Sequence, residues 1–341
     1  MTAALMLAVP LFGEEAEAPR VRVGGFADLE LHSSSEGDRE GLDLVQLDLY
    51  SSAALSARWS ALVEGTAERS LRGSNPGGET VDLDLERLYI AYSHSDAFRL
   101  EIGQTHTGIV RWNEREHRSR FLQTPIDVPA MARRPQADGA WPLRFVGLWV
   151  SGRIPGPLGL SYGSGIGAGS GRNRDETPIF GSDRSIALVL SLTMAPDAVP
   201  GFDVSAAAYA GRPRAAEEPL RERDVTFSIN YVRSGTEVRA EWGRMNHTAS
   251  DVVYRTTGYY ALVSKRLSGR GERARPYFLI DRLRVPGDET YLAEVSEENA
   301  WAGGVRYDIS NRFSIKGEYR SQRAPNGERE ALLGLQIGLS F

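Results

Sequence analysis

Cysteine is absent from this sequence of 341 residues, which excludes disulfide scaffolds, thiolate metal sites and cysteine nucleophiles together. Only five histidines are present and they are scattered, so an all-histidine metal site has little support and we expect no cofactor. No apolar run approaches the roughly 20 residues that a membrane-spanning helix needs. The best internal stretch, from Ile186 to Ala195, has half that length. A helical membrane protein is therefore excluded.

A strong charge of either sign is also missing. The chain has 40 basic and 45 acidic residues, a formal net charge of -5 and a pI near 5.7. Such a surface does not attract a phosphate backbone, so nucleic acid is excluded as a partner. A content of 41% hydrophobic and 25% charged residues is typical of a folded chain.

The amino terminus has the pattern of an export signal. Residues 4 to 12 (ALMLAVPLF) are apolar, and small residues follow up to Ala16-Glu17-Ala18, which has the A-x-A form of a cleavage site. We therefore expect a signal peptide over 1–18 and a single domain over 19–341. The positively charged region that normally precedes the apolar stretch of a signal peptide is missing, and Pro19 is a poor residue to follow a cleavage site. Both features suggest a truncated or misassigned start. The alternative is a buried N-terminal strand.

From residue 20 onward the dominant pattern has a period of two residues, which predicts strands. In the last segment Leu335, Ile337 and Leu339 share one face, while Gln336 and Ser340 share the other. In the preceding segment, 312–322, the polar face carries charged residues. The same pattern recurs at about 20–31, 42–56, 59–71, 81–93, 98–109, 144–154, 158–168, 184–195, 201–211, 222–233, 236–246, 252–266, 275–285, 299–310, 312–322 and 331–341.

These segments number about sixteen, and the connections between them alternate between short turns and longer polar loops. Ser234-Gly235 is an example of a short turn, whereas the connection from His247 to Asp251 is expected to be one of the longer loops. Short turns at one rim and long loops at the other are typical of a transmembrane antiparallel β-barrel of the outer membrane. The alternatives are a soluble all-β sandwich or a propeller, which place apolar residues inward and charges outward.

Two features of the apolar face bear on its surroundings. Aromatic residues lie toward strand ends, where their rings are expected to rest at the level of lipid headgroups. On the early strands the apolar face carries small residues, which suit protein packing better than lipid and suggest a homotrimer. The aromatic residues are Trp59, Tyr231, Trp301, Tyr307, Tyr319 and Phe341, and the small residues are Gly25, Ala27, Ala53, Ala61, Gly65 and Ala67.

The chain resembles a Gram-negative outer-membrane porin. The final residues GLQIGLSF are similar to the signal that such barrels present to the assembly machinery through a terminal aromatic, here Phe341. The stretch from Leu85 to Gly108 (LERLYIAYSHSDAFRLEIGQTHTG) resembles the hairpin before the constriction loop of phosphate-selective and related porins. The resemblance implies a passive outer-membrane channel for small hydrophilic solutes or ions, surrounded by outer-membrane lipid and often trimeric. It does not identify the solute.

The longest connection, from Val110 to Leu143, follows the fifth strand, where porins fold their third loop into the lumen. Its apolar residues, which include Trp112 and Met131, need packing partners, and this disfavours the alternative of a solvated external loop. We therefore expect a channel constriction with a modest basic excess. Its candidate residues are Arg111, Arg115, Arg118, Arg120, Arg133, Arg134, Glu114 and Glu116.

The polar faces of the strands predict the lining of the lumen. On the early strands these faces are acidic and on the later strands they are basic, which predicts two walls of opposite charge and a transverse field across the lumen. The alternative is a set of neighbouring salt bridges without a role in selectivity. The candidate lining residues are Asp48, Glu64, Asp82, Asp84 and Glu86 on the acidic side, and Arg153, Arg239, Arg282, Arg306, Lys316 and Arg320 on the basic side.

A second reading is a plugged barrel that serves as a surface adhesin or as a phospholipase-like enzyme. His94, His106 and His117 lie near Ser93 and Asp96 in the sequence and favour this reading weakly, because nearness along the chain does not make a catalytic triad. The strand pattern places His94 at a short turn and His117 in the long loop. We therefore expect a porin without catalytic residues.

Overall fold

The computed structural model describes residues 20–34, 41–70, 82–116, 120–133, 139–169, 186–213, 220–323 and 327–341. The expected signal peptide lies outside these residues and stays a prediction. Within them the chain forms sixteen strands: β1 (Arg20–Ser34), β2 (Gly41–Ala54), β3 (Trp59–Ser70), β4 (Asp82–Ser95), β5 (Phe98–His106), β6 (Arg144–Ile154), β7 (Leu160–Gly169), β8 (Ile186–Met194), β9 (Phe202–Gly211), β10 (Leu220–Arg233), β11 (Thr236–Ala249), β12 (Val252–Lys265), β13 (Ala274–Arg284), β14 (Glu298–Ser310), β15 (Phe313–Arg323) and β16 (Arg329–Ser340).

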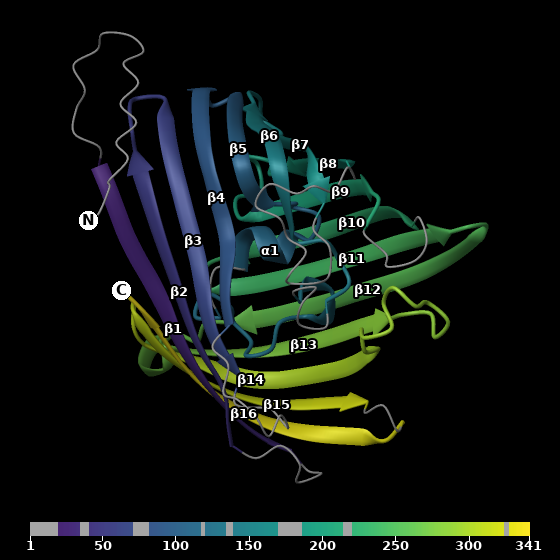
Figure 1. The fold of residues 1–341 in the computed structure, drawn as a ribbon. Coiled ribbons are helices and arrows are strands. Elements are labelled where there is room, and N and C mark those ends of the chain that lie inside the picture. The colour runs from purple at the N-terminus through teal and green to yellow at the C-terminus, as the bar shows by residue number, and fades with distance from the viewer. Residues whose placement is uncertain are drawn as a thin grey trace, which may run out of the picture.

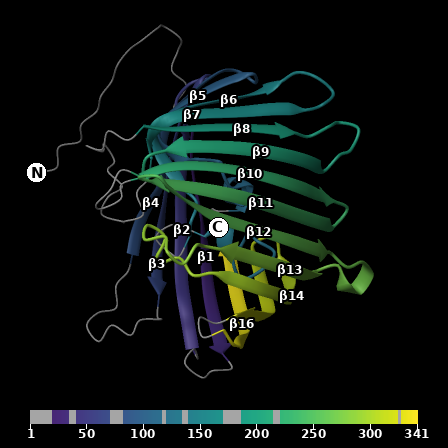
Figure 2. The same cartoon turned by 90° about the vertical axis from the view of Figure 1, so that its right-hand side faces the viewer.

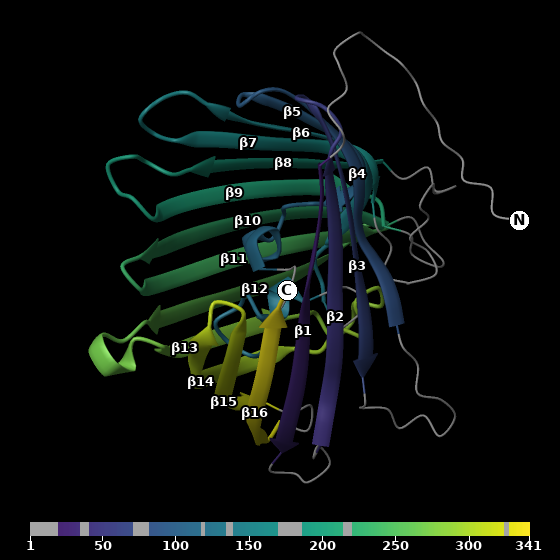
Figure 3. The same ribbon diagram turned by 90° about the vertical axis from the view of Figure 1, so that its left-hand side faces the viewer.

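The strands form one closed barrel in which each strand pairs antiparallel with its neighbours in the sequence (Figures 1, 2 and 3). The ring closes where β1 pairs with β16, from Phe26 opposite Ser340 to Ser34 opposite Leu332. The prediction of a sixteen-stranded antiparallel barrel is confirmed. Closure leaves no sheet edge unpaired, which is the arrangement that a bilayer requires of strands.

Alternation along each strand separates an apolar outer face from a polar inner face. In β10, Thr226, Ser228 and Asn230 are buried, whereas Phe227 and Ile229 between them are more than half exposed. In β16 the exposed residues include Leu335 and Leu339, while Gln336 is fully buried. The outer face of these strands is therefore mainly apolar, and the expected orientation of the last strand is confirmed.

Connections at one end of the barrel are short. Between β10 and β11 the turn is Ser234-Gly235, and both residues have positive φ, as a tight two-residue hairpin turn requires. At the opposite end the expected long loops fall largely outside the described residues. One expected long connection is wrong: β11 extends to Ala249, so only Ser250 and Asp251 separate it from β12. Residues before them continue the alternation and pair with β10 and β12, so they belong to the wall.

Helices form a small part of the described chain: α1 (Arg111–Glu116), η1 (Ala130–Ala132) and η4 (Gly269–Gly271). Within the described ranges, no helix has the length and apolarity needed to cross a membrane. Both α1 and η1 belong to the connection between β5 and β6, and Figure 1 shows α1 within the ring of strands. This connection positions the candidate site.

Candidate functional site

The connection between β5 and β6, hereafter the β5–β6 loop (residues 107–143), packs its apolar side chains against the inner face of the barrel. The indole of Trp112 contacts the ring of Tyr260 on β12 edge to face, with centroids 5.3 Å apart. Trp141 and Met131 lie over Gly243 of β11 and Gly258 of β12, where the missing β-carbons leave room for them. Burial of these apolar side chains holds the loop against the wall by the hydrophobic effect.

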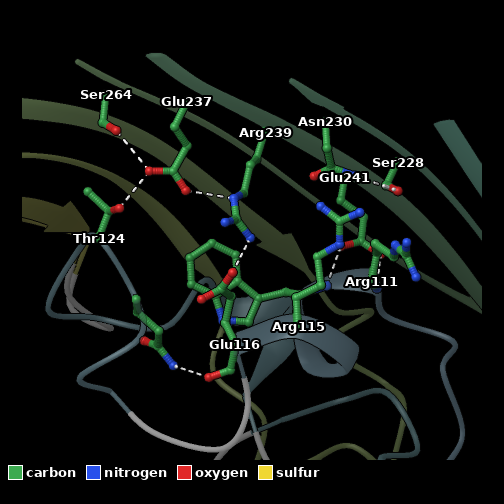
Figure 4. Close-up of polar contacts among 12 residues, drawn as sticks. Arg111, Arg115, Glu116, Thr124, Ser228, Asn230, Glu237, Arg239, Glu241 and Ser264 are labelled. Atoms are coloured by element: carbon green, nitrogen blue, oxygen red, sulfur yellow. Dashed lines mark hydrogen bonds and ion pairs between the residues drawn. The ribbon is translucent and has the colours of Figure 1, made fainter. Parts of the chain in front are cut away.

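The carboxylate of Glu241 on β11 binds the start of α1. The side chain of Glu241 accepts a hydrogen bond of 2.7 Å from the backbone N–H of Arg111 and one of 3.3 Å from that of Trp112. These two N–H groups lie in the first turn, where a helix has no internal acceptors and attracts negative charge. Tyr260 donates its hydroxyl to the same carboxylate at 3.1 Å. Figure 4 shows Glu241 beside Arg111 at the start of α1.

The end of α1 is fixed by an ion pair with β11. A guanidinium nitrogen of Arg239 lies 2.5 Å from an oxygen of Glu116, and its Nε lies 2.7 Å from Glu237 (Figure 4). Burial raises the pKa of the Glu116 carboxyl above its usual value, although the nearby Arg239 lowers it. Arg115, the residue before Glu116, lies 2.5 Å from Asp203 of β9. Strands β9 and β11 therefore contribute charged groups to one short helix.

The second half of the loop is bound by cations that approach its backbone. Lys316 of β15 donates to the carbonyl oxygen of Arg120 at 2.6 Å and to that of Pro125 at 3.1 Å. Arg306 of β14 donates to the carbonyls of Phe121 at 2.5 Å and Gln123 at 2.8 Å. These bonds satisfy carbonyl groups of the loop backbone, of which that of Arg120 also accepts the N–H of Gln123 at 3.2 Å.

Charged side chains of the same half pair with the wall. Arg120 donates to both carboxylate oxygens of Glu30 on β1 at 2.8 Å. Arg133 lies 2.7 Å from Glu298, and Arg320 lies 3.5 Å from Asp127. Burial raises the pKa of Asp127, but the surrounding cations, Arg320 foremost, outweigh burial and hold that pKa below its usual value.

The wall of β2 to β6 presents a second set of charged groups to the interior. Arg87 lies 2.5 Å from Glu64, and Arg144 lies 2.7 Å from Asp84. The register of β3 and β4 shifts between Glu64 and Gly65, and this β-bulge lets two successive residues of β4 face inward. Neither arginine was among the sequence candidates. For Arg87 the reason is that a strict two-residue period places it on the outer face.

The structure brings most candidate constriction residues to the barrel wall. Arg111, Arg115, Glu114 and Glu116 lie on α1, and Arg120 and Arg133 lie farther along the loop. Arg118 and Arg134 lie outside the described residues. Of the candidate lining residues, Asp48, Glu64, Asp84, Glu86, Arg239, Arg306, Lys316 and Arg320 face inward, and Arg153 is exposed at the short-turn end of β6. Asp82 is placed in β4, and its side chain is not described.

Two expectations about the lining are wrong. Arg282 lies between the buried residues Asp281 and Leu283, and therefore shares the outer face with the exposed Phe278 and Ile280. The later strands do not form a basic wall, because their inner face also carries many buried acids. These acids are Asp203, Glu222, Asp224, Glu237, Glu241, Asp281, Glu298 and Glu318.

The histidines of the enzyme reading do not meet. Leu88 of β4 pairs with Gln104 of β5, so His94 lies toward the short-turn end of that hairpin and His106 toward the long-loop end. His117 lies outside the described residues. In the described part of the chain, no three His, Asp or Glu side chains are grouped to hold a metal ion.

Comparison with solved structures identifies the fold. An anion-selective porin from Comamonas acidovorans aligns with a TM-score of 0.67 and 14% identity, over 95% of this chain and 100% of that chain. The chain has the fold of a porin. OprB from Pseudomonas putida aligns with a TM-score of 0.63 and 12% identity, over 95% of this chain and 94% of that one. OmpF from Salmonella typhi, in complex with daunomycin, aligns with a TM-score of 0.62 and 12% identity, over 94% and 97%.

Similarity at the level of sequence is much weaker. No protein-family model matches the chain, and no curated protein matches it. The low identities to the solved structures therefore establish the fold and leave the chemistry of the lumen to be argued from the residues of this chain.

Proposed function

We propose that this protein is a passive porin of a bacterial outer membrane, which conducts small hydrophilic solutes or ions and performs no catalysis. The observation that carries the proposal is a closed barrel with an apolar outer face, a charged inner face and a loop packed against that inner face. A water-soluble barrel has the opposite distribution. The porin fold of the structural neighbours supports the same function.

Aromatic side chains on the outer face support the membrane placement. On the outer face Trp301 contacts Phe278 on one side and Tyr319 on the other, with ring centroids 6.1 and 5.4 Å apart. Trp59 contacts Tyr92 at 5.0 Å. Trp59 begins β3 and Tyr92 lies near the end of β4, and rings at such strand ends rest at the level of lipid headgroups in transmembrane barrels.

We further propose that the β5–β6 loop narrows the lumen and sets the ion preference. Side chains of Arg111, Glu114, Arg115 and Arg120 are each between 20% and 31% exposed, so permeating ions reach them. Their partners, such as Asp203 and Glu30, are almost completely buried. Confinement at a low effective dielectric strengthens the action of each charge on a passing ion.

The outer face of β1 to β3 supports a homotrimer. Ala27 on β1 and Ala61, Gly65 and Ala67 on β3 lie on this face, whereas Gly25 of β1 is covered by the ring of Phe341. Small side chains allow close approach of a second barrel and offer little apolar surface to lipid. Chemical crosslinking in native membranes should give a trimer, and a monomer unchanged by crosslinking would contradict the assembly.

Single-channel recording in a planar bilayer tests the channel. The refolded protein should give discrete conductance steps, and asymmetric KCl should give a reversal potential that reports the ion preference. Replacing Arg115, Arg118 and Arg120 with Glu should move that potential toward cations, and shortening the loop should raise the conductance. An absence of steps would favour a plugged barrel with an enzymatic or adhesive role. An unchanged reversal potential would refute the constriction.

A further inference from the structure

Six arginines form a cluster on the outer face of the barrel, which is otherwise apolar. They lie at the long-loop end of four consecutive strands, and we call them the outer arginine patch: Arg221 and Arg223 on β10, Arg244 on β11, Arg255 on β12, and Arg282 and Arg284 on β13. Strand alternation fixes their orientation, because each is preceded and followed by residues of the inner face. Arg223, for example, lies between Glu222 and Asp224, which are both almost completely buried.

The pairing of β10 to β13 places the arginines in rows across the strands. These rows lie on the long-loop side of a row of aromatic residues. Arg223 pairs with Asn246, which pairs with Arg255. One step nearer the barrel middle, Arg244 pairs with Thr257, which pairs with Arg284. Neighbouring strands lie about 4.8 Å apart, so arginines in adjacent rows reach a common ligand.

The next row toward the barrel middle is aromatic. Phe227 pairs with Trp242, which pairs with Tyr259, and Tyr259 pairs with Arg282. The three aromatic side chains are each between 38% and 56% exposed on the outer face. The patch therefore directly borders an apolar surface of the kind that meets lipid chains.

The patch has no counter-charge on its own face. All five acidic residues of β10 to β13 face inward: Glu222, Asp224, Glu237, Glu241 and Asp281. Within the described residues, none of the six arginines takes part in an ion pair. Arginine on the lipid face is costly near the bilayer middle and much less so near the interface. Because these cations have no ion-pair partner among the described residues, the cluster is suited to bind the anionic groups of a ligand.

We propose that the outer arginine patch binds the phosphate groups of lipids that surround the long-loop end of the barrel. The acyl chains of such a lipid would cover the aromatic row while its phosphates reach the arginines above. A free phosphate ion would leave the aromatic row uncovered, and a second copy of the chain on the same patch would oppose arginine to arginine. The inference rests on the membrane placement proposed above and is independent of whether the barrel conducts.

Lipid retention by the full-length protein tests the assignment. The refolded protein in a mild detergent is titrated with diphosphorylated lipid A and, separately, with phosphatidylcholine, and bound lipid is counted by native mass spectrometry. The variant carrying Arg255→Gln and Arg284→Gln should bind lipid A about 30-fold more weakly, since each arginine near a charged interface contributes about one kilocalorie per mole. Phosphatidylcholine binding should change little.

A matched control carries Arg233→Gln and Lys265→Gln, which remove two cations of the outer face at the short-turn end of β10 and β12. Its lipid A binding should equal that of the wild type, and a gel shift on heating verifies that each variant is folded. If the double variant does not fold, Arg255→Gln alone should weaken binding about fivefold.

Three results would overturn the proposal. They are wild-type affinity in the patch variant, an equal loss in the control variant, and displacement of lipid A by millimolar inorganic phosphate, which would indicate a site for a free anion. Conductance recorded on the same preparations separates the two proposals. A barrel that retains lipid A without conducting would refute the channel and leave the patch assignment intact.

Discussion

Trp141 of the β5–β6 loop lies over Gly243 of β11 so closely that a β-carbon there would lie 2.9 Å from Cζ2 of its indole. A β-carbon on Gly258 of β12 would likewise lie 2.9 Å from Cη2. Met131 occupies the same space, with atoms 3.0 Å from both positions. Two adjacent glycines therefore form a notch in the wall that seats two large side chains of the loop.

Filling the notch should release the loop. Gly258→Val places carbon atoms where Trp141 and Met131 lie, and overpacking of this kind costs about 1–3 kcal/mol. The urea midpoint should fall, the loop should become sensitive to protease and the single-channel conductance should rise. Gly317→Ala is the matched control, since a β-carbon at Gly317 meets no atom within 4 Å. Equal effects of the two substitutions would contradict the role of the notch.

Membrane depth should govern the cost of a charge on the outer face. Leu190 lies at the centre of β8 and is 60% exposed, so Leu190→Arg should cost roughly 2–4 kcal/mol of stability in lipid vesicles. Leu158 is similarly exposed but belongs to the turn before β7, and Leu158→Arg should cost less than about 1 kcal/mol. Urea unfolding in vesicles measures both. Equal costs would argue that no bilayer surrounds the barrel.

The ion pair between Arg239 and Glu116 should anchor α1. Arg239→Gln leaves the Glu116 carboxylate buried without this cation, which costs about 3–5 kcal/mol for pairs of this kind. Because burial raises the pKa of Glu116, its lone carboxyl takes up a proton as the pH falls, and the loss should shrink at lower pH. Adding Glu116→Gln should recover part of the loss at neutral pH. A double variant as unstable as the sum of the two single variants would show that the pair is not coupled.

Asp127 should make the attachment of the loop sensitive to acid. Its folded-state pKa lies below the usual value of 3.8, so its charged form stabilises the folded chain above that value and the contribution is lost as the pH falls through the folded-state pKa. Asp127→Asn should therefore unfold at lower urea than the wild type at neutral pH. The difference should shrink as the pH falls below 3.8 and through the folded-state pKa. A difference that persists in acid would assign the effect to packing instead of charge.

The barrel could be predicted from the sequence because lipid and lumen impose opposite chemistry on alternate residues. Segments such as 331–341 repeat that contrast without interruption, and the positions of all sixteen strands are confirmed. The outward orientation of Leu335 and the inward orientation of Gln336 follow from the same contrast. Local sequence was sufficient here because each strand faces the same two environments along its length.

The residues that line the lumen were less predictable on strands whose inner face is also apolar. On β13, Leu279 and Leu283 are buried on the inner face, while Phe278 and Ile280 face outward. Both faces of that strand are therefore apolar, and the period does not identify the side on which Arg282 lies. Which wall receives the β5–β6 loop depends on contacts between residues far apart in the chain, and the sequence gives no local signal for them.

The seam between β1 and β16 has a consequence for the order of assembly. Gly25 and Phe341 exchange two backbone hydrogen bonds, of 3.1 and 3.0 Å, across the greatest separation in sequence of any strand pair. Pairings between neighbours such as β10 and β11 close short loops, but the seam forms only after both ends of the sheet have been brought together. Until then the nascent sheet has two open margins that can pair with other chains. Completion of the seam therefore removes both open margins at once, so that protection from pairing with other chains depends on the last contact to form.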